Sequence, residues 1–242
     1  VHWEKIVMRI VDKSKKIPQL EDLWIEGQNL ELIKSAIALP NGIVITSWPT
    51  GSWKSTTLYA ALSLLNKENV NIMTLEDPVE NQVDGINQSQ VKPQIGYTFA
   101  YGLRTALRQD PDIIMVWEIR DKETIEIAIE ASLTWHLVLS TIHTNSAAET
   151  LTRVIQMGIQ PFLIPASFNA VIAQRLIRRL CPHCKKEIWV QNLDKDTLHN
   201  IQNALKLTKK SELTQRVSPE ILKSPKFYEP VGCEHCDHTG YK

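Results

Sequence analysis

A short polar loop ending in Lys-Ser-Thr-Thr lies between an apolar run and a helix-forming segment, within IVITSWPTGSWKSTTLY. This is the layout of a phosphate-binding loop, in which backbone N–H groups wrap a phosphate chain, a lysine neutralises it and a hydroxyl binds Mg²⁺. The usual pattern, Gly-x4-Gly-Lys-[Ser/Thr], needs glycine where this chain has Trp48 and Trp53, so a chance loop without function is the alternative. The residues expected to bind ATP and Mg²⁺ are Thr50, Gly51, Ser52, Lys54, Ser55 and Thr56.

Two carboxylates and a histidine follow three further apolar segments. Glu76 lies in TLEDPVE, Glu118 in DPDIIMVWEIRD, and His143 directly after LVLSTI. Ligands of an open α/β sheet bind beyond the carboxyl ends of its strands, so we expect these side chains to converge near Lys54. Nucleotide hydrolysis needs an oriented water, a metal and positive charge on the γ phosphate. We therefore expect Glu118 to activate water, Glu76 to lie near Mg²⁺ or the water, and His143 to sense the γ phosphate.

Four cysteines form two Cys-x2-Cys pairs separated by 48 residues: Cys181 with Cys184, and Cys233 with Cys236. Four thiolates close the tetrahedral coordination of Zn²⁺ and leave no open position for catalysis, so the spacing predicts a structural zinc site. Redox pairs or disulfides are the alternative, which a reducing compartment disfavours. Three nearby histidines are expected to be bystanders, namely His183, His235 and His238.

The elements that position these residues alternate between buried strands and amphipathic helices. Wholly apolar strands separated by helices imply a parallel sheet covered on both faces. The predicted fold class is α/β, a RecA-like phosphate-loop core with a mostly parallel sheet, plus a small tetracysteine zinc module. Helix starts are expected at Thr98 and at a Ser146–Glu149 capping box. Strands are predicted at 43–45, 71–75, 113–116 and 137–141, and helices at about 29–37, 54–65, 99–109, 121–133, 146–158 and 195–207.

Four parts are expected along the chain. They are the end of a truncated N-terminal domain (1–15), a linker and helix (16–37), the nucleotide-binding core (38–180) and the tetracysteine region (181–242), which we expect to be truncated at its C-terminus. The first eleven residues alternate charged and apolar positions, which predicts a half-buried strand. The start at Val1 and the stop at Gly-Tyr-Lys lead us to expect that the chain is a fragment.

Charge and hydropathy limit the partners. Lys+Arg and Asp+Glu both number 27, so no net charge attracts the chain to nucleic acid or anionic lipid. Hydrophobic residues make up 43% of the chain, as in ordinary globular proteins, and no apolar run approaches the ~20 residues of a membrane-spanning helix. No signal segment opens the chain either. We expect a cytoplasmic protein.

Taken together, these segments resemble the secretion ATPases that drive type IV pilus assembly and type II secretion. The resemblance covers nearly the whole chain and rests on LEDPVE, LRTALRQDPDIIMVWEIRD, LVLSTIHTN, AQRLIRRLCPHC and GCEHCDHTGYK. It implies that Glu118 is the catalytic glutamate and that Arg104, Arg108 and Arg120 are motif arginines, candidates to contact phosphate within one subunit or across a subunit boundary. It also implies a phosphate loop at 48–55, an Asp box at 74–80, a Walker B segment at 113–118 and a His box at 140–145.

The resemblance implies partners and cofactors as well. Family members form hexamers with ATP at the subunit interfaces and dock on an inner-membrane platform protein, which implies a position peripheral to that membrane. The implied cofactors are ATP, Mg²⁺ and Zn²⁺. Assembly ATPases carry a tetracysteine module that retraction motors generally lack, so the resemblance favours assembly.

The tryptophans are unusual in number and position. Glycine numbers only 9 of 242 residues, about half the usual ~7%, whereas tryptophan numbers 7. Compared with the family, six tryptophans stand where glycine is usual, and restoring them would raise the glycine count to 15. Some bacterial lineages read UGA as glycine, and translating such a gene with a table that reads UGA as tryptophan would produce this pattern. The six positions are Trp3, Trp24, Trp48, Trp53, Trp117 and Trp135.

Three functions are weighed. The first is an ATP-hydrolysing motor subunit for pilus assembly or type II secretion. The second is a catalytically inactive scaffold subunit of the same machine. An indole at Trp53 would obstruct the phosphate cradle and impair ATP hydrolysis by the literal sequence, meaning the protein with all seven tryptophans as written. The third is a nucleic-acid motor, which the neutral charge and the lack of a basic, aromatic stripe disfavour.

Overall fold

The structure is a computed structural model, and contacts within it divide the chain into two units. The first unit comprises Val1–Ile25 and Leu30–Arg175, and the second Glu26–Asn29 and Leu176–Lys242. The strand predicted at 1–11 lies outside the described residues, apart from Ile6 and Met8, which are in no strand and are 83% and 81% exposed. The described residues are 6, 8, 17–23, 25, 27–47, 54–189, 192–207 and 226–242.

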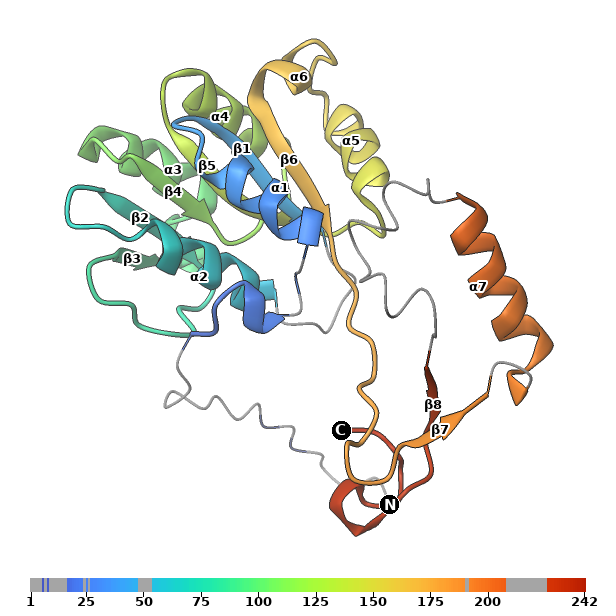
Figure 1. The fold of residues 1–242 in the computed structure, drawn as a ribbon. Coiled ribbons are helices and arrows are strands. Elements are labelled where there is room, and N and C mark those ends of the chain that lie inside the picture. The colour runs from blue at the N-terminus through green and yellow to red at the C-terminus, as the bar shows by residue number, and fades with distance from the viewer. Residues whose placement is uncertain are drawn as a thin grey trace, which may run out of the picture. The chain divides into compact units, whose positions relative to one another are not determined.

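A six-stranded sheet forms the centre of the first unit (Figure 1). The strand order is β3-β2-β4-β5-β1-β6, and each pair of neighbours is parallel. β5 therefore lies between β1, which precedes the phosphate loop, and β4, which precedes Glu118. The strands are β1 (Gly42–Ser47), β2 (Ile72–Glu76), β3 (Asn87–Gln90), β4 (Ile113–Val116), β5 (Leu137–Ile142) and β6 (Phe168–Ala173).

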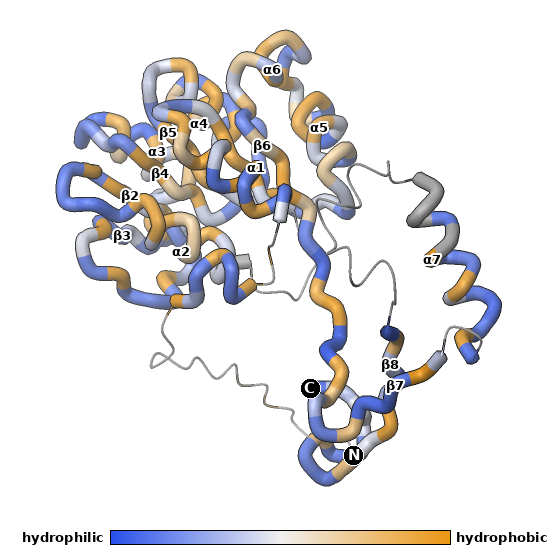
Figure 2. Tube along the Cα trace, in the orientation of Figure 1, coloured by the Kyte–Doolittle hydropathy of each residue, from blue (hydrophilic) through white to orange (hydrophobic). Residues whose placement is uncertain are grey.

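Helices cover both faces of this sheet. Alternate residues of a strand point to opposite faces, so neighbouring residues of β1 pack against different helices. Ile43 and Ile45 of β1 belong to a buried cluster with residues of α3 and α4, whereas Val44 belongs to a second cluster with residues of α1 and α2. The predicted α/β fold class is thereby confirmed. Figure 2 shows hydrophobic residues concentrated along the sheet. The helices are α1 (Gly27–Ile37), α2 (Lys54–Leu65), α3 (Phe99–Ala106), α4 (Lys122–Leu133), α5 (Ala147–Gln156) and α6 (Leu163–Ser167), with 3-10 turns η1 (Glu21–Leu23), η2 (Pro93–Ile95) and η3 (Leu107–Gln109).

Side-chain caps fix where two of these helices begin. Thr98 accepts a hydrogen bond from the amide of Tyr101 at the start of α3, and Ser146 accepts one from the amide of Glu149 at the start of α5. Both caps agree with the sequence. The Glu149 carboxylate, however, accepts from the amide of Asn145, one residue before the cap, at 2.8 Å. The second bond of the predicted capping box is thus shifted by one residue.

The second unit contains a small antiparallel ribbon and one long helix. β7 (Lys186–Ile188) pairs with β8 (Phe227–Glu229), α7 spans Lys195–Leu207, and the turn η5 covers Glu234–Cys236. A further bridge joins Leu180 to Tyr241 and brings the two cysteine segments together. Within the parts of the chain that the structure describes, no helix has the length and apolar character to cross a membrane.

Candidate functional site

The sheet places the predicted catalytic residues at one edge. All its strands are parallel, so their carboxyl ends share that edge: Glu118 follows β4, His143 follows β5, and α2 begins beyond β1 at Lys54. Residues 48–53 of the phosphate loop lie outside the described part of the chain. Of the other predicted ATP and Mg²⁺ ligands, Lys54 and Ser55 open α2, and Thr56 is half-buried in its first turn.

Glu118 is a buried carboxylate with a basic side chain on each oxygen. Its side chain is 6% exposed; Oε2 accepts from Arg120 Nε at 2.8 Å and Nη2 at 2.7 Å, and Oε1 lies 2.8 Å from His143 Nε2. The hydrogen bond and charge of Glu118 raise the pKa of Arg120. Arg120 is 58% exposed and His143 40%, so the site opens to solvent on their side. A buried carboxylate among basic groups can orient a water and accept its proton.

Hydroxyl groups of β5 hold the main chain that carries Glu118. Ser140 Oγ donates to the carbonyl of Val116 at 2.7 Å, and Thr141 Oγ1 donates to the carbonyl of Trp117 at 2.6 Å. The amide of Ile119 donates to the carbonyl of Thr141 at 2.9 Å. The Glu118 segment is therefore fixed to β5 from both sides. These hydroxyls were not singled out from the sequence, where two hydroxyl residues ending an apolar strand carry no specific signal.

Glu76 ends β2, the strand beside β4, and its carboxylate is enclosed by neutral donors. It is fully buried, and its Oε1 accepts from Thr74 Oγ1 at 2.5 Å and from Gln88 Nε2 at 2.9 Å. Its Oε2 accepts from the hydroxyl of Tyr59, on α2. Burial and this hydrogen bond to Glu76 raise the pKa of Tyr59. Tyr59 thus links the phosphate-loop helix to the Asp box, a contact that the sequence did not suggest.

The three candidate arginines lie in different places. Arg120 contacts Glu118, as described above. Arg104, on α3, pairs through Nη1 with Oε1 of Glu123 at the start of α4, at 2.6 Å. Arg108 is exposed in the η3 turn. Their contact with phosphate stays a prediction.

Two of the six tryptophans predicted to replace glycine lie in well-described surroundings. Trp135 has φ +70° and is 76% exposed. The amides of Thr134 and His136 on either side of it both donate to the carbonyl of Ala131, in the last turn of α4. This left-handed position after a helix is where glycine is favoured. Trp117 is buried and packs edge-on against Tyr59, with ring centroids 6.3 Å apart. The others, Trp3, Trp24, Trp48 and Trp53, lie outside the described residues.

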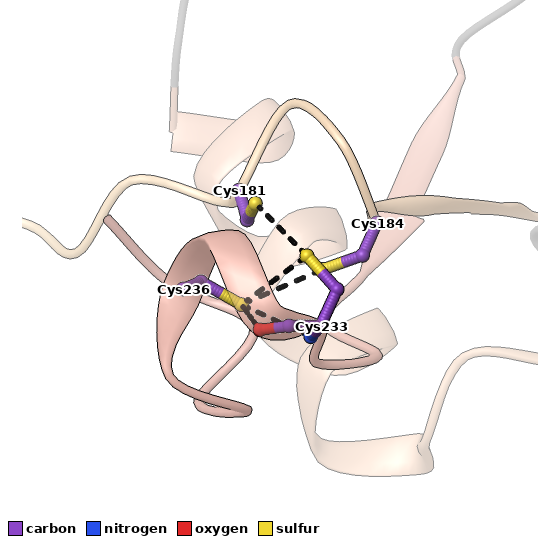
Figure 3. Close-up of side chains that lie close together, drawn as sticks. All are labelled: Cys181, Cys184, Cys233 and Cys236. Atoms are coloured by element: carbon purple, nitrogen blue, oxygen red, sulfur yellow. Dashed lines mark hydrogen bonds between the residues drawn. The ribbon is translucent and has the colours of Figure 1, made fainter.

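The four cysteines form one cluster, shown in Figure 3. All four Sγ atoms lie within 4.8 Å of one another; Cys181 and Cys233 are 3.9 Å apart, and Cys184 and Cys236 3.8 Å. Four sulfurs bound tetrahedrally to zinc at ~2.3 Å would be about 3.8 Å apart, so the cluster fits Zn²⁺. These distances exceed a disulfide bond, at about 2.05 Å.

Backbone donors favour the thiolate form that zinc requires. Amides of Cys233 and Gly240 donate to Sγ of Cys236, each at 3.2 Å, and the amide of Gly232 donates to Sγ of Cys184 at 3.3 Å. Desolvation raises the pKa of Cys236, but hydrogen bonds from backbone amides and from the thiols of Cys184 and Cys233 together lower this pKa to about 6. Desolvation raises the pKa of the neighbouring Cys233. The rings of His183 and His235 stack beside the cluster, with centroids 4.4 Å apart.

Comparisons with known proteins agree with this arrangement. The family model described as "Type II/IV secretion system protein" matches residues 1–242. The chain is 48% identical over 241 residues to the Type II secretion system ATPase E of Vibrio cholerae, a match covering 100% of this chain and 44% of that protein. It is also 48% identical over 239 residues to the Type IV pilus assembly ATPase PilB of Myxococcus xanthus, covering 99% of this chain and 39% of that protein.

A solved structure shares the fold. The pilus retraction motor PilT with bound ADP superposes with a TM-score of 0.59 and 25% identity, over 88% of this chain and 69% of that one. The chain spans less than half the length of the two curated relatives above. The resemblance inferred from the sequence is confirmed: the chain belongs to the type II/IV secretion system protein family.

Proposed function

We propose that this chain is the catalytic part of an ATP-hydrolysing motor subunit that powers type IV pilus assembly or type II secretion. The observation that carries the proposal is the pairing of buried Glu118 with Arg120 and His143 at the carboxyl edge of the sheet. The names of the similar proteins, two of them ATPases of these machines, support it, as does the ADP held by PilT.

In this proposal each group at the edge has one task. Lys54 and the backbone of the phosphate loop bind the β and γ phosphates, and Ser55 binds Mg²⁺. Glu118 orients the attacking water and accepts its proton, while Arg120 and His143 turn towards the γ phosphate as charge develops there. Oε2 of Glu118 accepts from two nitrogens of Arg120, whereas Oε1 contacts His143 Nε2 and has a second lone pair that can accept from the water.

The partners and metal follow from the same family membership. We propose a homo-hexamer with ATP at subunit interfaces, docked on an inner-membrane platform protein and therefore peripheral to that membrane. The four clustered cysteines would hold a structural Zn²⁺, which would join the two cysteine segments of the second unit. Equal numbers of basic and acidic residues argue against a nucleic-acid partner, and salt-dependent binding to single-stranded DNA would contradict this.

The tryptophans decide whether the literal sequence is active. The left-handed backbone at Trp135 supports glycine as the residue encoded there, and by extension at the phosphate-loop positions Trp48 and Trp53. We therefore propose that the protein with six glycines is the active ATPase and that the literal one, with bulky indoles in the loop, binds ATP poorly. If the six codons are UGG, the glycine hypothesis fails and an inactive scaffold subunit becomes the better proposal.

Glu118→Gln in the full-length six-glycine protein tests the function. The amide keeps the size of the side chain but cannot accept the proton, so kcat should fall by about 10² or more while the affinity for ATP is retained. The matched control is Glu126→Gln on α4, where the carboxylate is 47% exposed and pairs with Lys122; its kcat should match the parent. If Glu118→Gln has the same kcat as the parent, Glu118 is not the general base.

A further inference from the structure

Three buried hydroxyl groups connect the end of β1 with the segment that carries His143. Ser47 is the last residue of β1, Thr144 directly follows His143, and Thr150 lies on α5; they are 1%, 7% and 0% exposed. Thr144 Oγ1 lies 2.6 Å from Ser47 Oγ and 2.6 Å from Thr150 Oγ1. Ser47 Oγ also lies 2.7 Å from the carbonyl oxygen of Thr144.

Counting protons gives these hydrogen bonds a direction. A carbonyl cannot donate, so Ser47 must use its one hydroxyl proton on the carbonyl of Thr144. Thr144 Oγ1 must then donate to Ser47 Oγ, and Thr150 Oγ1 to Thr144 Oγ1. The reverse direction would leave two oxygens facing each other at 2.7 Å without a proton. Thr144 is therefore held to Ser47 at two points, through its carbonyl and through its hydroxyl.

The position of this network matters more than its energy. Buried hydroxyls stabilise a fold little even when they are paired, and apolar side chains of similar shape could fill the same space. What the hydroxyls provide is a fixed geometry between Ser47, next to the phosphate loop, and Thr144, next to His143. His143 in turn contacts Glu118 at 2.8 Å. A continuous set of contacts thus joins the phosphate-loop strand to the proposed base.

We propose that Thr144 is a positioning residue, which sets His143 against Glu118 by anchoring the segment after β5 to the end of β1. The inference rests on the proposed ATP hydrolysis, to which it adds a residue that does not touch the reacting atoms. Small displacements of groups around a catalytic base reduce turnover strongly, whereas nucleotide affinity depends on the phosphate loop itself. Loss of the Thr144 hydroxyl should therefore lower kcat and leave KM unchanged.

Thr144→Val in the full-length six-glycine protein tests the inference. Valine keeps the shape of the threonine side chain but lacks the hydroxyl. Ser47 retains the carbonyl of residue 144 as its acceptor. Thr150 can donate to the carbonyl of Ser146, which lies 3.1 Å from its Oγ1 in the parent structure. No donor is orphaned, so the variant should fold. We expect kcat to fall about tenfold or more with KM for ATP unchanged within about twofold. Thr144→Ser, which retains the hydroxyl, should keep most of the parental kcat.

Thr124→Val is the matched control for exchanging a buried hydroxyl for a methyl group. Thr124 is fully buried on α4, and its Oγ1 is an unpartnered buried side-chain oxygen within the described chain. Its kcat should equal that of the parent. A Thr144→Val protein with parental kcat would overturn the inference while leaving the proposed ATPase intact.

A second measurement separates this inference from the proposed function. If the six-glycine parent hydrolyses no ATP, the proposed function fails, and a crystal structure of Thr144→Val then decides the inference by geometry alone. A distance from His143 Nε2 to Glu118 Oε1 increased from 2.8 Å to beyond about 3.5 Å would support the positioning role. An unchanged distance would refute it.

Discussion

Position 135 offers a test in which glycine is expected to be more stable than alanine, the reverse of their usual order in a helix. Its backbone is left-handed, with φ +70°, and follows the last turn of α4. We compare Trp135→Gly with Trp135→Ala, because both remove the same indole and differ only in the Cβ atom. In this conformation a Cβ atom comes too close to the following carbonyl oxygen, at a cost of about 1–2 kcal/mol.

The greater backbone freedom of glycine in the unfolded chain offsets part of this cost, by about 0.5–1 kcal/mol. The free energy of unfolding of the glycine variant should therefore be about 1 kcal/mol higher than that of the alanine variant. The comparison with tryptophan itself is less informative, because the indole is 76% exposed and its partial burial contributes a term of similar size. Urea unfolding followed by circular dichroism measures the difference.

The reverse order is expected inside the helix. Glu130 is exposed on α4, and there alanine should be more stable than glycine by about 1 kcal/mol. Glu130→Ala and Glu130→Gly are thus the matched control pair. If alanine is also the more stable residue at 135, the reasoning from the left-handed backbone is refuted, and with it the structural support for glycine there.

Four further predictions follow, two on the metal cluster and two on buried hydroxyls. The protein should contain one zinc ion per chain by elemental analysis; Cys181→Ser should lose it, whereas His183→Ala should retain it, and retention by both would contradict the tetracysteine site. Removal of zinc by a strong chelator should make Leu176–Lys242, the larger segment of the second unit, sensitive to protease. Resistance of this segment without metal would count against a structural role for zinc. Tyr59→Phe should lower the free energy of unfolding by about 1–3 kcal/mol, because the buried carboxylate of Glu76 loses a hydrogen-bond donor. Tyr101→Phe is the control and should have little effect, since Tyr101 is 59% exposed. Equal effects of the two substitutions would contradict this account. Thr124→Val should be neutral or stabilising by up to about 1 kcal/mol in the same assay, and a clear loss would show that its hydroxyl has a partner.

The sequence predicted the fold best where apolar runs are long and clearly bounded. The predicted ranges 54–65, 113–116 and 195–207 coincide with α2, β4 and α7. β3 was missed because its residues, Asn-Gln-Ser-Gln, are polar and only partly buried, and it pairs at the edge with β2 alone. A pattern of burial cannot reveal a strand that is held mainly by its backbone.

The site shows a similar division. Strand-end reasoning brought Glu118 and His143 to one edge of the sheet, where the structure has them in contact. It did not anticipate that the carboxylate of Glu76 would be enclosed by Tyr59 and other neutral donors. The link between Ser47 and Thr144 also lay beyond it, because such contacts depend on strand register and loop path, and a single hydroxyl residue is compatible with many positions.

The strand order has a consequence for how such a site could vary. Since β5 separates β1 from β4, the ends of the two strands that lead to the phosphate loop and to Glu118 are two strand spacings apart, about 9–10 Å. Main-chain hydrogen bonds set this span, so exchanging one core side chain for another hardly alters it. The loops at the carboxyl edge can therefore change in length or composition, to suit a different machine, without altering the distance between these strand ends, where the proposed mechanism has a phosphate and a water.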